Sequence, residues 1–125
     1  MTRILIVDDE ANVRTAVVQV LLSCNRTDLD FDQVSTGTEA LRRLQSGRYN
    51  LMLADTAMPG MSGAELMRAV RGDDKLKALP VIMMLAVGAG KQDVLDAVAL
   101  GISGFVIKPF RPDQLRVQLK KVLGW

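Results

Sequence analysis

The 125-residue sequence predicts an α/β fold in which a five-stranded parallel sheet carries helices on both faces. Short apolar runs alternate five times along the chain with longer stretches that have apolar residues at helical spacing. The connections are short, and right-handed crossovers between parallel strands leave few other topologies. We therefore expect a doubly wound sheet with the strand order 2-1-3-4-5, in one domain that spans residues 1–125.

Each predicted strand is a short run bounded by turn residues or charges. The first is rich in β-branched residues and stops at three consecutive acids. The second alternates apolar and polar side chains, which is typical of a half-buried or an edge strand. The third runs directly into an aspartate and then into a turn that contains Pro59 and Gly60. The five predicted strands are Arg3–Val7, Leu29–Val34, Leu51–Ala54, Val81–Leu85 and Gly104–Ile107.

Each predicted helix has an apolar face, and most have a start or stop signal. Ser35–Thr38 supplies a turn and a helix cap, whereas Gly47 and Gly101 end helices. Pro112 stands where the start of a helix tolerates proline. The predicted helices are Ala11–Ser23, a short helix around Ala40–Leu44, Ser62–Arg71, Lys91–Leu100 and a last helix that begins near Pro112.

The composition excludes several classes of site. The chain has no histidine, which removes zinc sites and Ser-His triads, so any metal must be a hard cation bound by oxygen ligands. The single cysteine, Cys24, cannot form an internal disulfide and is predicted to be a buried thiol, which fits a reducing compartment. Lys and Arg total 16 against 14 Asp and Glu, so no direct nucleic-acid binding is expected. Because no apolar run suits a signal peptide or a membrane span, we expect a cytoplasmic protein without a membrane partner.

Acids and one lysine follow three of the predicted strands. Asp8 and Asp9 follow the first strand and Asp55 follows the third, so in the expected strand order they meet at the carboxyl edge of the sheet. Close carboxylates repel one another, and a bound Mg²⁺ offsets this charge. Lys108 follows the fifth strand and is expected at the same edge, where a carboxylate nucleophile and an ammonium suit phosphoryl transfer. The structural alternative is that these acids only cap turns or helix starts.

Three motifs resemble those of the receiver domains of two-component response regulators, the CheY-like family, and the similarity covers essentially the whole chain. They are Val7-Asp8-Asp9-Glu10, Asp55-x-x-Met58-Pro59 with Gly63, and Lys108-Pro109-Phe110. The resemblance implies the flavodoxin-like (βα)5 fold, Mg²⁺ as cofactor, and a phosphoryl group received from a histidine kinase or a phosphotransfer protein. It implies no enzyme activity beyond the domain's own phosphorylation and dephosphorylation.

The same resemblance assigns a role to each site residue. Asp55 is the phospho-acceptor, and Lys108 contacts the phosphoryl group. Asp8, Asp9 and Asp55 hold Mg²⁺, with help from the backbone carbonyl of Ala57. These roles are carried over from the family onto the matching positions of this sequence.

The fourth strand departs from the family pattern. Receivers have a Ser or Thr at its end, but here the position is Leu85 when counted from Asp55 and Ala86 when counted from Lys108. The missing hydrogen bond is worth about 1.5–3 kcal/mol, which is as large as a typical allosteric coupling of about 1–3 kcal/mol. We therefore expect phosphorylation to be transmitted weakly, or by a route other than Ser/Thr movement. Phe105 stands at the family's aromatic switch position, and a purely structural role for it is an equal alternative.

The resemblance also implies partners. A receiver signals through protein–protein contacts with a downstream target or with an output domain of its own chain, and a homodimer is expected to use the face formed by residues 91–123.

Two other hypotheses compete with that of a phosphorylated receiver. The first is a receiver-fold interaction module that works without phosphorylation, for which the missing hydroxyl is the signature. The second is a phosphate-ester hydrolase, but the sequence offers no second acid placed as a general acid.

Overall fold

The computed structural model describes residues 1–125 and confirms the predicted α/β fold. Its five parallel strands form one sheet in the order β2-β1-β3-β4-β5. The strands are β1 (Thr2–Val7), β2 (Leu29–Val34), β3 (Leu51–Asp55), β4 (Val81–Leu85) and β5 (Gly104–Ile107). The helices are α1 (Ala11–Ser23), α2 (Gly37–Ser46), α3 (Gly63–Arg71), α4 (Lys91–Ala99) and α5 (Pro112–Leu123). No helix combines the length and hydrophobicity that crossing a lipid bilayer requires.

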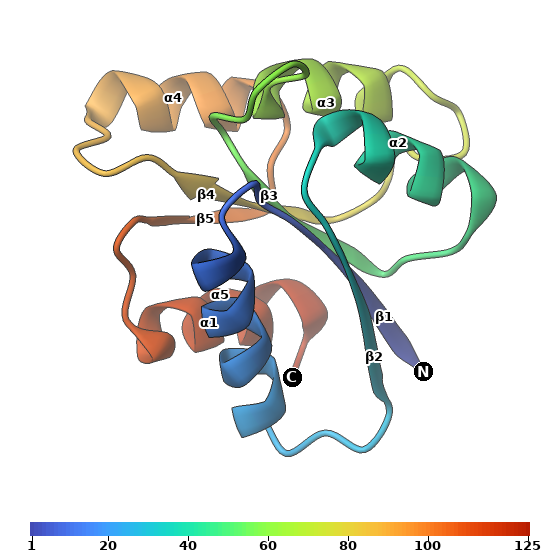
Figure 1. Ribbon diagram of the computed structural model, residues 1–125, viewed down its shortest axis with the longest axis vertical. Helices are drawn as coiled ribbons and strands as arrows, with labels where there is room; N and C mark the ends of the chain where they lie inside the picture. Colours follow the sequence, from blue (N-terminus) through green and yellow to red (C-terminus); the bar gives the residue numbers. More distant parts are fainter.

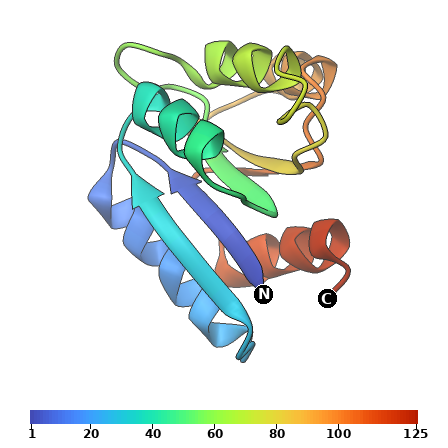
Figure 2. The same cartoon turned by 90° about the vertical axis from the view of Figure 1, so that its right-hand side faces the viewer.

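The sheet separates two layers of helices. Helices α2, α3 and α4 cover one face, and α1 and α5 cover the other (Figure 1). Figure 2 shows β1 and β2 side by side and running in the same direction. Strand β2 pairs only with β1 and is therefore an edge strand, which is one of the two alternatives that its alternating sequence predicts.

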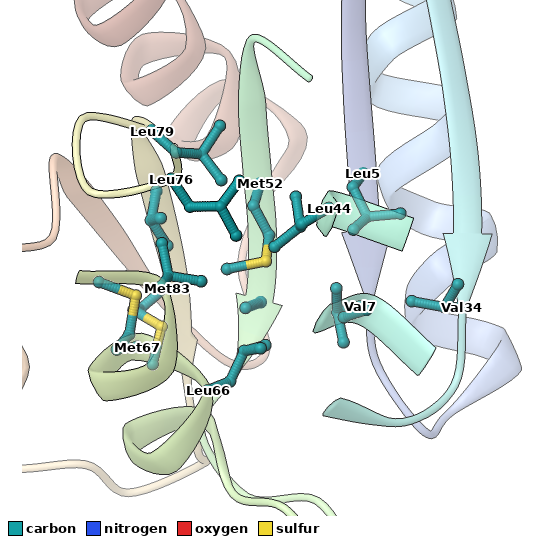
Figure 3. Packing of buried hydrophobic residues seen from close by; sticks show 14 of the residues in the cluster. Leu5, Val7, Val34, Leu44, Met52, Leu66, Met67, Leu76, Leu79 and Met83 are labelled. Carbon is teal, nitrogen blue, oxygen red and sulfur yellow. The ribbon is translucent and has the colours of Figure 1, made fainter. Parts of the chain in front are cut away.

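Strand side chains alternate between two hydrophobic cores. On β1, Leu5 and Val7 face the α2–α4 layer, whereas Ile4 and Ile6 face α1 and α5. Strands β3 and β4 are buried along their whole length, as expected for central strands covered on both faces. The larger core contains 17 buried residues and the smaller core 12. Figure 3 shows members of the larger core packed together from both strands and helices.

Side-chain caps fix the starts of two helices. The hydroxyl of Thr36 accepts a hydrogen bond from the Glu39 amide at 3.1 Å, and that of Ser62 accepts one from the Glu65 amide at 3.2 Å. The first bond confirms the cap predicted within residues 35–38.

The position of Cys24 differs from the prediction of a buried thiol. Cys24 is the C-cap of α1 and is only partly buried. Its Sγ lies 3.4 Å from the carbonyl oxygen of Val20, one helical turn back. Because the residue stands beyond the last turn of the helix, it borders the smaller core without entering it.

The guanidinium of Arg71, at the end of α3, joins separate backbone segments. Its Nη1 donates to the carbonyls of Lys77 at 3.1 Å and Leu79 at 2.8 Å, and its Nη2 donates to that of Gly101 at 2.7 Å. Lys77 and Leu79 lie in the connector before β4, and Gly101 follows α4. Gly101 has a φ of +84°, and a Cβ there would lie 3.2 Å from Arg71 Nε. The end of α3 is therefore fixed to the end of α4.

The start of α3 packs against the end of β3 through Gly63. Its amide donates to the carbonyl of Thr56 at 3.0 Å. A Cβ at position 63 would overlap the carbonyl oxygen of Asp55 and lie 2.8 Å from the Thr56 Cα. Only glycine allows this close approach. The first residue of α3 therefore packs directly on the backbone that follows Asp55 and holds it in place.

The substitution Gly63→Ala is expected to lower the free energy of unfolding by about 1–3 kcal/mol, because the added methyl overlaps backbone atoms that cannot move aside. Urea unfolding followed by circular dichroism measures the change. Gly47→Ala is the matched control, since its Cβ would meet no atom closer than 3.5 Å. We expect that control to leave stability unchanged or slightly raised. Equal losses in the two variants would contradict the role given to Gly63.

Candidate functional site

Two carboxylates and one ammonium meet at the carboxyl ends of β1, β3 and β5. Asp8 follows β1, Asp55 ends β3 and Lys108 follows β5. The Lys108 Nζ lies 2.8 Å from Asp8 Oδ2 and 3.1 Å from Asp55 Oδ1. Asp8 and Asp55 are the only buried charged residues, and the Lys108 side chain is 10% exposed. Because a buried carboxylate is unfavourable unless it is paired, Lys108 stabilises the ionised form of both acids.

Asp8 is held through its side chain and its backbone. Its Oδ1 accepts a hydrogen bond from the Glu10 amide at 2.9 Å, and its carbonyl accepts one from Arg14 Nη1 at 2.7 Å. Its Oδ2 lies 2.8 Å from the Lys108 ammonium, has no other polar partner, and keeps a second lone pair. A buried carboxylate oxygen in this condition retains the capacity to coordinate a cation.

Asp9 and Glu10 are exposed and stand beside Asp8. Carboxylate oxygens of these three acids lie within 4.8 Å of one another. Asp55 is not a member of this group, and the Lys108 ammonium lies between Asp8 and Asp55. Glu10 Oε1 is also 3.6 Å from Lys108 Nζ. Glu10 is a site residue that was not predicted, although it belongs to a run of three consecutive acids.

The surroundings shift the pKa of two site residues. Burial raises the pKa of Asp55, and the nearby negative charge of Asp8 raises it further, although Lys108 and the backbone amide of Ala57 partly offset both effects. Burial opposes the charge on Lys108, but its contacts with the Asp8 and Asp55 carboxylates outweigh this effect and raise its pKa. Lys108 is therefore a fixed positive charge at neutral pH.

The donor set at this edge fits a hard divalent cation. Asp8, Asp9 and Glu10 offer only oxygen atoms, and the backbone of Ala57 lies beside the Asp55 carboxylate. Asp8 Oδ2 is a buried carboxylate oxygen whose one polar partner is Lys108. Oxygen ligands of this kind suit Mg²⁺ in proteins.

The end of β4 contains Leu85 rather than a polar residue. Leu85 is the last residue of the strand and is 2% exposed, whereas Ala86 follows the strand and is exposed. Phe105 is partly buried and packs against the same core as Leu85. The nearby Thr56 hydroxyl lies 3.5 Å from the Met84 carbonyl and borders the α4 side of the sheet. An apolar side chain therefore fills the interior at the position where the sequence analysis expects a switch.

The face formed by α4, β5 and α5 exposes apolar side chains, as expected from the apolar composition of residues 91–100. The exposed members are Leu95, Val98, Ile107 and Val117. On α5, Arg116 Nη1 donates to Ser23 Oγ of α1 at 3.1 Å.

Comparison with known proteins gives a consistent result. The family model described as "Response regulator receiver domain" matches residues 4–120. The chemotaxis protein CheY of Pseudomonas aeruginosa is 38% identical over 120 residues, which are 96% of this chain and 94% of that protein. The structure of the chemotaxis response regulator CheY4 of Vibrio cholerae has a TM-score of 0.86 at 30% identity and covers 98% of both chains.

A further solved structure holds ligands. The response regulator protein TrrA from Thermotoga maritima, in complex with Mg²⁺ and BeF, has a TM-score of 0.81 at 34% identity, with 98% of this chain and 99% of that chain covered. The matched range contains all of the sheet except the first two residues of β1, together with the three residues that meet at its carboxyl edge. With this fold, and with the family match over almost its full length, the chain belongs to the CheY-like response regulator receiver domains of two-component signalling.

Proposed function

We propose that this receiver accepts a phosphoryl group on Asp55 from a histidine kinase or a phosphotransfer protein. The observation that carries the proposal is the buried Asp55 carboxylate with the Lys108 ammonium at 3.1 Å and Asp8 on the other side of that ammonium. A carboxylate in this position is a nucleophile with a fixed cation beside it.

The transfer is a displacement at phosphorus. A carboxylate oxygen of Asp55 forms the new P–O bond, the bond between phosphorus and the donor's histidine nitrogen breaks, and an acyl phosphate results. Lys108 contacts the transferred group and offsets negative charge on its oxygens. A cavity of about 290 Å³, which Glu10, Val87 and Lys108 help to line, lies beside the lysine at this edge.

The proposed Mg²⁺ ligands are the carboxylates of Asp8, Asp9 and Asp55 and the backbone carbonyl of Ala57. The Mg²⁺ and BeF complex of the related TrrA supports Mg²⁺ as the cation. When bound, Mg²⁺ supplies positive charge for the phosphoryl oxygens. Asp8 contributes a buried oxygen, and its position is fixed by the Glu10 amide before any ion binds.

The domain is proposed to act through protein contacts and not as an enzyme with a separate substrate. Its partners are a downstream protein target or an output domain of its own chain. The exposed apolar residues of the α4–β5–α5 face are the proposed contact surface, and a homodimer through residues 91–123 would cover them.

The buried Leu85 favours a second candidate, a receiver-fold interaction module that works without phosphorylation. A leucine cannot donate a hydrogen bond, so a phosphoryl group on Asp55 would find no side-chain donor at the end of β4. The first experiment below separates the two candidates, since only the first requires an adduct on Asp55.

Incubation with Mg²⁺ and a small-molecule phosphodonor such as acetyl phosphate is expected to give one phosphoryl adduct by intact mass spectrometry. Asp55→Asn is expected to abolish the adduct, because an amide is not a nucleophile toward phosphorus. Asp74→Asn, whose side chain is 98% exposed, is the matched control and is expected to be phosphorylated like the wild type. An unmodified wild-type protein would overturn the proposal and leave the second candidate.

Leu85→Thr is expected to enlarge the response to phosphorylation. With Mg²⁺ and beryllofluoride, the amide chemical shifts of Ala86 and Phe105 are expected to change little in the wild type and clearly more in the variant. The reason is that the new hydroxyl adds a hydrogen bond of about 1.5–3 kcal/mol to a charged group. Leu85→Val, which shortens the side chain without a hydroxyl, is the control. Wild-type shift changes as large as those of Leu85→Thr would refute weak transmission.

Asp55→Asn is also expected to raise the stability of the metal-free protein at neutral pH. Because the pKa of Asp55 is raised above its ordinary value of 3.8, the folded state binds this proton more tightly than the unfolded state. The ionised carboxylate thus destabilises the fold above its folded pKa, and this effect disappears as the pH falls toward 3.8. Urea unfolding at several pH values should show an advantage of the variant that shrinks on acidification. An advantage that grows on acidification would contradict the sign.

A further inference from the structure

A cavity of about 300 Å³ lies on the α4 side of the sheet, between the end of β4 and the helices α3 and α4. Twelve residues line it, and eight of them are hydrophobic. Thr56 and Leu85 contribute from the strand ends, Ala64 from α3 and Ala97 from α4. The alanines leave this space open because a methyl group cannot reach across it.

The cavity is distinct from the phosphoryl site. Asp55, Asp8 and Lys108 are not among its lining residues. Thr56 directs its side chain to the side of the sheet occupied by Leu85, opposite to that of the preceding Asp55, as expected for neighbours at the end of a strand. Whatever occupies this cavity therefore contacts neither the acceptor carboxylate nor the lysine beside it.

The charged groups at the cavity are both acidic. Asp93 and Asp96, on α4, are exposed and line it, and no lysine or arginine forms an ion pair with either of them. Asp93 Oδ2 accepts one hydrogen bond from the Gly90 amide, and Asp96 Oδ1 accepts one from Gln92 Nε2, both at 2.8 Å. The second oxygen of each carboxylate makes no such bond, so two carboxylates with free acceptor capacity stand at an apolar cavity.

We propose that this cavity binds a small organic cation, with an apolar ring or short aliphatic body inside and an ammonium or amidinium group against Asp93 and Asp96. Its volume is at the lower end of the range of about 300–1,000 Å³ that is usual for ligand sites, and its mostly apolar lining with few polar groups is typical of them. The two carboxylates disfavour an anion. The Thr56 hydroxyl supplies one further polar contact at the inner end.

Benzamidinium is a suitable probe because it joins an aromatic ring to a planar cation. Titration of the ¹⁵N-labelled, unphosphorylated protein is expected to give saturable shifts at the amides of Thr56, Leu85 and Ala97. Benzyl alcohol at the same concentration is expected to bind more weakly, and benzoate is expected not to bind. Since no phosphodonor is present, failure here does not bear on phosphorylation of Asp55.

Variants test the two parts of the site separately. Asp96→Asn is expected to weaken benzamidinium binding about three- to fivefold, the size expected for an exposed ion pair. Ala64→Leu is expected to abolish binding by filling the cavity, and Ala89→Leu is a second filling variant should the first fail to fold. Ala99→Leu, on the exposed side of α4, is the control and is expected to bind like the wild type.

Three results would overturn the proposal. The first is the absence of saturable shifts with benzamidinium. The second is equal binding of benzamidinium and either benzyl alcohol or benzoate, which would remove the role of the carboxylates. The third is undiminished binding by folded Ala64→Leu or Ala89→Leu protein, which would place the probe elsewhere.

Discussion

The ammonium of Lys108 stands within 3.6 Å of carboxylate oxygens from Asp8, Glu10 and Asp55, and the arrangement at this edge of the sheet depends on it. Asp8 and Asp55 are buried, so each would be an uncompensated charge without this partner. The lysine comes from β5 and the acids from β1 and β3, with β4 between them in the sheet. The backbone amide of Lys108 also donates to the Leu85 carbonyl at 2.9 Å, which sets the position of the lysine relative to β4.

Because side chains alternate along each strand, the ion cluster and the cavity beneath α4 lie on opposite sides of the sheet. Asp55 and Thr56 are neighbours in the chain, yet one faces the ion cluster and the other lines the cavity beneath α4. Leu85 belongs to the second side, where it fills part of the larger core. The ion cluster of Asp8, Asp55 and Lys108 thus lies on one side of the sheet, and the cavity with Leu85 lies on the α4 side.

Much of this structure follows from patterns in the sequence. The five alternating units predict a parallel sheet with helices on both faces, and the observed strand order places Asp8, Asp55 and Lys108 at one edge. The remainder depends on side-chain geometry. The position of Lys108 between Asp8 and Asp55 depends on the conformation of its long side chain. The contact of Glu10 with the same ammonium depends on that conformation too. The choice between Leu85 and Ala86 depends on where β4 ends, because counting from either neighbouring motif gives different answers. The cavity exists because alanines line it. An apolar sequence pattern does not show whether the space beside an alanine is empty or filled by a neighbouring side chain.

The contacts of Arg71 give α4 two unequal ends. At its carboxyl end, Gly101 is bonded to the guanidinium that also binds the connector before β4. At its amino end, the chain enters the helix through Gly88 and Gly90, where a Cβ would meet no atom within 4 Å. A rearrangement of α4 would therefore be a rotation about the Arg71 end, with the largest displacement at the end nearest the ion cluster. The contacts of Arg71 thus fix the carboxyl end of α4, while its amino end, at the carboxyl edge of the sheet, is free to move.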